Sequence, residues 1–300
     1  MELSIIIPFY KGEKFLNRIN KNITNLKCNA MKEKISIEFV IINDSPSIKL
    51  PKLTGNIIEI NNMKNEGIHY SRVRGLKEAK GEYIIFLDQD DEIDSKNVIK
   101  HYKFIKKKNA DVSVSNGVFI FGEKSKPIYL NKFYKHNVCK EFGYLYIKDL
   151  IISPGQCIIK KKSIPSGWLQ HIMVTNGTDD YLLWLLMFND KNKFVYFDEF
   201  TYYHYDTGNN VSFDIDNWRK SLKELEHNLY CIPDYPNKKV RKLKKLNSYK
   251  YSLLKETKFV FLLKSIFHID LFAANIIFSL INGSTVVGHK EMKKGKKFNE

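Results

Sequence analysis

The sequence predicts an α/β protein in which a mostly parallel sheet carries helices on both faces. Two features of the sequence lead to this fold class. Short apolar runs rich in β-branched residues alternate with segments whose apolar residues recur at helical spacing. Polar clusters directly follow several of these runs, and open parallel sheets bind their ligands beyond the ends of the strands.

The first 94 residues follow a β-α-β-β-α-β pattern. Each expected strand is a short run dominated by Ile, Leu, Val or Phe, as in sheets that are covered on both faces. The expected strands are Leu3 to Phe9, Ile37 to Ile42, Ile57 to Ile60 and Tyr83 to Leu87, and the expected helices cover 13–27 and 67–80.

The middle of the chain has a weaker pattern, and 122–150 is mixed and rich in aromatic residues. Its more regular segments predict a further set of helices and strands. We expect helices over 95–108 and 179–188, an extended segment over 111–121, and strands over 156–160, 194–197 and 201–205.

After Asp216 the chain is predicted to be helical. Residues 238–264 place an apolar stripe between lysines, and 259–281 is nearly apolar but contains three ionisable residues, Lys264, His268 and Asp270. Each of these would cost several kcal/mol at the centre of a bilayer, so we expect no transmembrane span here. A pair of helices at a membrane surface and a helical subdomain or dimer interface remain equally good interpretations.

The composition limits the class of protein. With 300 residues, 43% hydrophobic and 13% aromatic, the chain can bury a full core, which excludes disordered, collagen-like and coiled-coil proteins. Its four cysteines lie far apart and suggest neither a zinc ribbon nor a disulfide framework. The apolar start lacks a secretory signal, so we expect a cytoplasmic protein.

The charge of the chain is unevenly distributed. The formal net charge is +16, and from Asp216 onward 18 basic residues face 8 acidic ones, which leaves +10 in the last 85 residues. Such a basic tail suits nucleic acid, an anionic membrane surface or acidic substrates, and it is equally compatible with an ordinary solvated surface. Charge alone does not choose among these interpretations.

A cluster of carboxylates, Asp88-Gln89-Asp90-Asp91, follows the strand at Tyr83 to Leu87. Carboxylate oxygens in a turn suit Mg²⁺ or Mn²⁺, which take one or two protein carboxylates together with substrate phosphates. A metal ion held there would neutralise the charge that develops on a diphosphate leaving group. The alternative is a solvated acidic turn before the helix at 95–108.

The order of these motifs resembles the nucleotide-sugar-binding half of inverting family 2 glycosyltransferases, which have the GT-A fold, a Rossmann-like sheet. The resemblance covers roughly residues 3–94, with weaker matches further on, and together about two thirds of the chain. The matching segments are Ile5 to Tyr10, Ile41 to Ser45, Asn65 to Gly67, Ser71-Arg72 with Gly75, Ala79 to Tyr83, Phe86 to Asp91, Thr178 to Leu185, Tyr202 to His204 and Asn210 to Ser212.

The resemblance implies roles for residues on the donor side. Pro8 and Tyr10 would form one wall of the base pocket, and Asn43 and Asp44 would face the base. Arg72 would fork onto a phosphate or a base edge. The sequence departs from the family where Asn43 replaces a carboxylate, and also at Val73, where the family has an asparagine.

The resemblance also implies the metal-binding residues. Asp88 would face the ribose or sugar, Asp90 would bind Mn²⁺ or Mg²⁺, and Asp91 would share one of these roles. His204 would complete the metal shell or contact the diphosphate, although a lone histidine is more often a packed residue.

On the acceptor side, a hydroxyl nucleophile needs a general base, and the resemblance makes Asp180 our choice. Its neighbour Asp179 could raise one of the two pKa values toward neutral pH, although the pair could also simply begin a helix. Trp168 could stack on a sugar face or belong to the core.

We therefore expect an inverting enzyme that moves a hexose or N-acetylhexosamine from a UDP-linked donor to a hydroxyl of a surface glycan or lipid-linked acceptor. Residues 1–215 would form the catalytic domain, with a donor half at 1–94 and an acceptor half at 95–215. The basic helical extension at 216–300 would meet the inner face of the cell membrane or another copy of the chain. The alternatives are a sugar nucleotidyltransferase, a basic nucleic-acid-binding protein and a non-catalytic sugar-binding relative; no nucleic-acid-binding motif is present.

Overall fold

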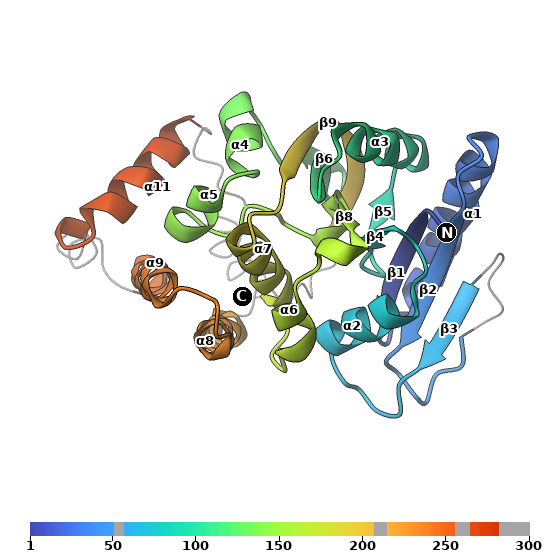
Figure 1. Ribbon diagram of the computed structural model, residues 1–300, viewed down its shortest axis with the longest axis horizontal. Coiled ribbons are helices and arrows are strands. Elements are labelled where there is room, and N and C mark those ends of the chain that lie inside the picture. The colour runs from blue at the N-terminus through green and yellow to red at the C-terminus, as the bar shows by residue number, and fades with distance from the viewer. Residues whose placement is uncertain (51–56, 207–214, 256–264, 282–300) are drawn as a thin grey trace.

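The computed structural model describes residues 1–50, 57–206, 215–255 and 265–281. Within these ranges the strands form one nine-stranded sheet (Figure 1). Along it the strands follow the order β3-β2-β1-β4-β8-β6-β9-β5, and β7 pairs with β6 at the side. The predicted fold class, an α/β protein with a Rossmann-like sheet, is confirmed.

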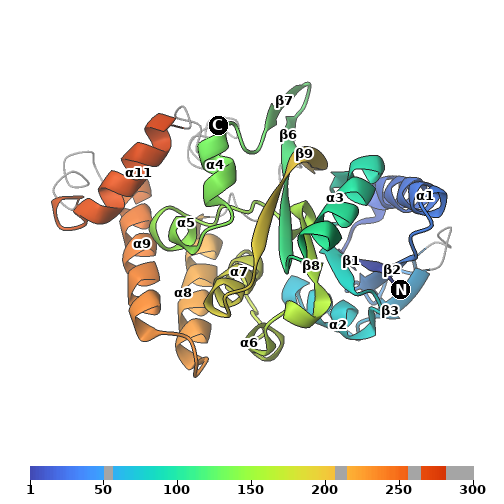
Figure 2. The ribbon, with the colours of Figure 1, turned by 45° about the horizontal axis from the view of Figure 1, so that its top comes forward.

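The first half of the sheet is parallel; three of its strands are buried on both faces, whereas the edge strand is partly exposed. Its strands are β3 (Ile57–Asn61), β2 (Ile37–Asn43), β1 (Leu3–Phe9) and β4 (Tyr83–Phe86). The helices α1 (Leu16–Lys32) and α3 (Ser95–Lys108) lie on one face and α2 (Ile68–Glu78) on the other (Figure 2).

Gly75 lets α2 approach the sheet closely. A Cβ atom at this position would lie 2.5 Å from Cγ2 of Ile6 and 2.7 Å from Cδ1 of Ile42, closer than side chains tolerate. Because this contact fixes α2 against β1 and β2, it also fixes the height at which the helix holds Arg72.

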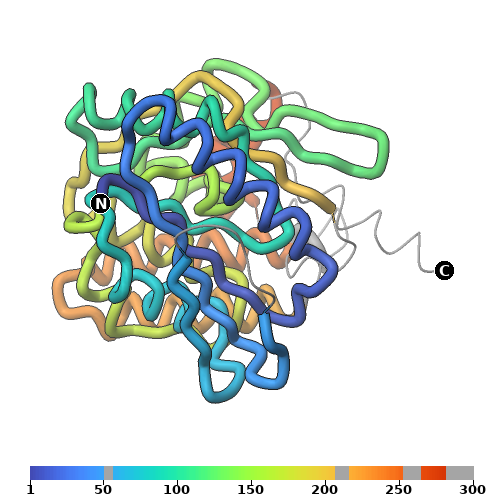
Figure 3. Tube along the Cα trace, turned by 90° about the vertical axis from the view of Figure 1, so that its right-hand side faces the viewer, coloured from blue at the N-terminus to red at the C-terminus, as the bar shows by residue number. Residues whose placement is uncertain are grey.

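The second half of the sheet is mixed. β8 (Cys157–Lys160) runs antiparallel to β4 and to β6 (Val112–Phe121), while β9 (Phe194–Tyr205) runs parallel to β6. The short β5 (Glu92–Ile93) pairs with β9, and β7 (Lys124–Pro127) forms a hairpin with β6 that extends beyond the body (Figure 3).

The two strands expected at 194–197 and 201–205 are one strand, β9, with an irregularity between them. Ser115 of β6 pairs with Phe197 and the next residue, Asn116, pairs with Phe200, so β9 has extra residues at this point. The exposed residues Asp198 and Glu199 lie in this bulge, which explains why the apolar pattern is interrupted there.

Several helices follow in the second half of the chain. The short helices α4, α5 and α6 lie in segments for which the sequence predicted no helix, and α7 begins at Asp179 as expected. Their bounds are α4 (Lys132–Asn137), α5 (Glu141–Tyr146), α6 (Ser166–Gln170) and α7 (Asp179–Asn189), and the remaining helices are α8 (Ile215–Cys231), α9 (Asn237–Lys255) and α11 (Ile269–Ile281).

The C-terminal helices confirm that the chain becomes helical after Asp216. α8 packs against α7 and α9, and α9 and α11 both pack against α5 (Figures 1 and 2). In the part of the chain that the structure describes, no helix is both long and apolar enough to cross a bilayer. The predicted motif at 210–212 and the segments 256–264 and 282–300 of the extension lie outside the described residues.

Candidate active site

The carboxyl ends of β1 and β4 are joined by the side chain of Gln89. Its amide accepts from the backbone N–H of Tyr10 and donates to the carbonyl of the same residue, with both distances 3.0 Å. Pro8 is buried inside β1, whereas the Tyr10 ring is 40% exposed beyond it. Of the two predicted wall residues, Tyr10 thus presents its ring at the edge of the sheet, and its contact with a base stays a prediction.

Asn43 is the last residue of β2 and Asp44 follows it beside this edge, but both are buried and bonded to protein groups. The Asn43 amide donates to the carbonyl of Ile48 (2.7 Å) and to Oδ1 of Asn61 (2.9 Å). The Asp44 carboxylate accepts from the backbone N–H groups of Glu66 (2.8 Å) and Gly67 (2.9 Å). Both side chains therefore order loops in this structure, and their predicted contact with a base is untested.

Arg72 connects the two halves of the chain. It is buried on α2, and its guanidinium donates from Nη2 to Asp88 (2.6 Å) and from Nη1 to Asp179 (2.7 Å). Ser153 Oγ donates to the other oxygen of Asp88 at 3.2 Å. One arginine thus holds a carboxylate at the end of β4 and a carboxylate at the start of α7 in a fixed relation.

The two acidic residues that begin α7 have different electrostatic environments. Burial acts to raise the pKa of Asp179, but the Arg72 guanidinium outweighs it and holds that pKa below its usual value. For Asp180, burial and the charge of Asp179 raise the pKa to about 7. Asp180 is therefore a carboxyl group that can exchange a proton near neutral pH, as a general base must.

Asp91 belongs to the interior of the fold. Its carboxylate accepts from the Tyr202 hydroxyl and, at 3.1 Å, from the backbone N–H of Tyr205, and it lies 3.2 Å from Nδ1 of His204. Burial acts to lower the pKa of His204, but the Asp91 carboxylate raises it above its usual value. Because these contacts occupy Asp91, the structure does not place it as a ligand-facing residue.

Asp90 differs from its neighbours because no side-chain cation neutralises its carboxylate among the described residues. Burial, followed by the charges of Asp91 and Asp88, raises its pKa to about 7. A group of three or more His, Cys, Asp or Glu side chains that would hold a metal ion is absent from the described residues. The Asp90 carboxylate fits a Mg²⁺ or Mn²⁺ site in which diphosphate and water supply most of the ligands.

Trp168 is part of the core. Its side chain is fully buried, its Nε1–H donates to the carbonyl of Asp179 at 2.8 Å, and its ring packs against His69 and Phe86. The suggestion that it stacks on a sugar face is wrong for this structure, and the core interpretation is confirmed. Its indole supports the turn from which Asp179 and Asp180 project.

Helix α8 fixes the loop that leads into Asp179 and Asp180. The Glu224 carboxylate accepts from the backbone N–H groups of Val174 (2.5 Å) and Thr175 (2.8 Å), and Ser221 Oγ lies 2.7 Å from the Thr178 hydroxyl. From the other side, Nδ1 of His69 accepts from the backbone N–H of Met173 at 2.9 Å. These contacts leave no mark in the sequence, because a glutamate on an amphipathic helix gives no signal that it binds a distant loop.

Comparison with known proteins identifies the family. The model of glycosyl transferase family 2 matches residues 4–166, which is more than half of the chain. The chain belongs to glycosyltransferase family 2. Among the curated relatives of this glycosyltransferase are the cholesterol galactosyltransferase of Borreliella burgdorferi, 31% identical over 126 residues, and the poly(ribitol-phosphate) beta-glucosyltransferase of Bacillus spizizenii, 28% identical over 122 residues.

The alignment with the Borreliella burgdorferi protein covers 40% of this chain and 34% of the relative. The alignment with the Bacillus spizizenii protein covers 38% of this chain and 19% of the relative. Among solved structures, S. aureus TarS in complex with UDP-GlcNAc matches 84% of this chain and 71% of its own with a TM-score of 0.55 at 17% identity. A TarS structure of which 43% is covered gives the same TM-score at 16% identity. The structural likeness establishes the GT-A fold.

The Glu224 contact predicts a local effect of mutation. We expect Glu224→Ala to free residues 171–178, because it leaves two backbone N–H groups without their acceptor at a cost of about 1–3 kcal/mol. Amide hydrogen exchange should speed up in this loop and not in β1 or β4. Lys223→Ala, a change at the neighbouring exposed position, is the control; equal exchange in both variants would contradict the role given to Glu224.

Proposed function

We propose that this glycosyltransferase moves a hexose or N-acetylhexosamine from a UDP-linked donor to a hydroxyl of a surface glycan or lipid-linked acceptor, with inversion at the anomeric carbon. The observation that carries the proposal is the bridge of Arg72 between Asp88 and Asp179, with the titratable Asp180 beside it. The printed names of relatives, a galactosyltransferase and a beta-glucosyltransferase, and the UDP-GlcNAc complex of TarS support a nucleotide-sugar donor.

The proposed reaction is one in-line displacement. Asp180 accepts the proton of the acceptor hydroxyl while that oxygen bonds to the anomeric carbon and the bond to the diphosphate breaks. Arg72 holds Asp179 ionised, and burial together with the negative charge of Asp179 raises the pKa of Asp180 to about 7. Asp88, fixed by Arg72 and Ser153, orients the ribose or sugar of the donor.

A divalent metal ion is part of the proposal. Asp90 would hold it, with Nε2 of His204 as the only other side-chain donor proposed, since Nδ1 lies against Asp91. When bound, the ion would offset negative charge on the departing diphosphate. The cation would also stabilise the ionised form of Asp90, which burial and the charges of Asp91 and Asp88 destabilise.

The donor site can be tested by thermal unfolding with a panel of UDP, GDP, CMP and dTDP sugars, each with Mn²⁺, Mg²⁺ or EDTA. We expect a UDP sugar with metal to stabilise the wild type, by about 2.7 kcal/mol at a hundredfold excess over Kd. Asp90→Asn should lose the metal-dependent part of this gain, whereas Glu78→Gln, an exposed change on α2, should keep it. The proposal fails if no nucleotide sugar stabilises the wild type under any of these conditions.

The proposed place of action is the inner face of the cell membrane, where lipid-linked acceptors lie. The basic extension, with a net charge of +10 in the last 85 residues, supports this proposal because anionic lipids attract clustered lysines.

A further inference from the structure

Helix α11 has one face that is anchored and another that has no partner among the described residues. Its inner side buries Leu271 and Phe278, and the Phe278 ring meets Tyr134 of α4 edge-on at 4.9 Å. The Asn275 amide donates to the carbonyl of Tyr146 at the end of α5 (3.0 Å). These contacts fix the rotation of α11, so its outer face is presented in a defined orientation.

The outer face of α11 is exposed and mainly apolar, and Asp270 at its margin is paired with Lys242 of α9. The side chains of Ile269 and Leu280 are 71% and 76% exposed, and Ile277 is 51% exposed. Their spacing is that of a single helix face, and monomeric proteins rarely leave such a stripe in water. The residues on or just before this face are Ile266, Phe267, Ile269, Ala273, Ile276, Ile277, Leu280 and Ile281.

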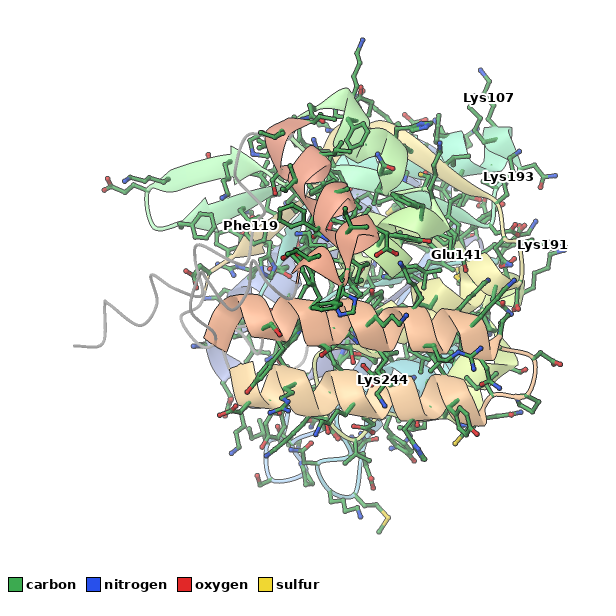
Figure 4. All side chains as sticks on the ribbon, turned by 90° about the vertical axis from the view of Figure 1, so that its left-hand side faces the viewer. Lys107, Phe119, Glu141, Lys191, Lys193 and Lys244 are labelled. Carbon is green, nitrogen blue, oxygen red and sulfur yellow. The ribbon has the colours of Figure 1, made fainter. Side chains whose placement is uncertain are left out.

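Exposed basic side chains lie on helix α9, which contacts α11 through the ion pair of Lys242 and Asp270. Figure 4 shows α8, α9 and α11 on one side of the molecule, with Lys244 of α9 labelled there. Exposed Lys238, Arg241 and Lys245 are on the same helix as Lys244. A second copy of the chain that docked here through the same surface would bring its own α9 lysines against these, whereas an anionic bilayer would be attracted.

We propose that the outer face of α11 lies in the surface layer of an anionic bilayer, with its axis parallel to the membrane and the α9 lysines against the lipid headgroups. Over its described residues, Ile269–Ile281, the helix is too short to cross the bilayer, but its apolar face suits the boundary between headgroups and acyl chains. This inference names the surface by which the enzyme would contact the membrane that holds its acceptor, and in that respect it rests on the proposed function.

Vesicle co-sedimentation tests the surface. Wild-type enzyme should bind vesicles of phosphatidylcholine with phosphatidylglycerol, bind pure phosphatidylcholine more weakly, and lose binding as salt is added. The double variant Ile277→Asp with Leu280→Asp should bind the anionic vesicles at least about tenfold more weakly. The double variant Met31→Asp with Met63→Asp adds the same two negative charges at residues of the donor half that are 69% and 95% exposed, and it should bind as the wild type does.

Two further readouts separate the possible failures. UDP-sugar binding and hydrolysis should be equal in the wild type and the α11 variant, so loss of vesicle binding with intact donor turnover concerns the surface alone. The proposal is overturned if the wild type does not bind anionic vesicles or if the α11 variant binds them normally. It is also overturned if the variant only converts a dimer to a monomer in size-exclusion chromatography.

Discussion

Asp180→Asn is expected to lower kcat by about 10²–10⁴-fold while leaving the donor Kd within about twofold of the wild type. An amide has nearly the same shape as the carboxyl group but does not accept the proton of the acceptor hydroxyl. Donor affinity should persist because Arg72, Asp88 and Ser153 are unchanged. Transfer rates and calorimetric donor binding measure the two quantities separately.

If Asp180 is the general base, kcat of the wild type should increase with pH. Asp180 acts as a base only when it is deprotonated, and its pKa is raised to about 7, so kcat should rise about tenfold per pH unit below 7 and level off above it. The rising limb should be absent from the residual activity of Asp180→Asn. A variant that keeps more than a tenth of wild-type kcat, with the limb intact, would assign the base to another residue.

Arg72→Met is expected to affect both stability and activity strongly. It leaves the buried carboxylate of Asp179 without its cation, and breaking a buried pair in this way costs about 3–5 kcal/mol. Without the guanidinium, burial should raise the pKa of Asp179 above its usual value, so stability should fall as pH rises from that usual value through the raised one. Urea unfolding at pH 5 and pH 8 measures this, with the greater loss expected at pH 8.

A matched pair of variants separates folding from positioning at Arg72. Arg72→Lys keeps the charge but cannot reach both carboxylates with a planar fork, so we expect it to fold and still lose about 100-fold in kcat/KM. Lys77→Met, an exposed change on the same helix, should be neutral in both assays. Wild-type activity in Arg72→Lys would show that the bridge between the two halves is not needed.

Sequence patterns predicted the elements that local chemistry specifies. Apolar runs such as Ile37 to Ile42 form buried strands because both faces of the sheet are covered, and the polar clusters after them meet at one edge because the strands are parallel. The distant pairings gave no local signal. Arg72 and Asp179 are 107 residues apart in the chain, and Glu224 reaches a loop 50 residues away, so only the folded chain reveals these contacts.

The sequence predicted the roles of some residues of the site better than those of others. The pair Asp179-Asp180 was expected to split its pKa values, and the structure supplies the physical cause, since Arg72 contacts only the first. Trp168 could not be placed from its sequence, because an indole in a loop has the same pattern whether it lines a pocket or fills the core.

The most direct test is a crystal structure of Asp180→Asn with an intact UDP sugar and Mn²⁺. The account predicts that the side chain at position 180 lies on the face of the anomeric carbon opposite the diphosphate, with room between them for one hydroxyl oxygen about 3 Å from each. The donor should lie at the edge formed by Tyr10 and Asp88. A donor bound elsewhere, or a diphosphate on the same side of the sugar as position 180, would contradict the account.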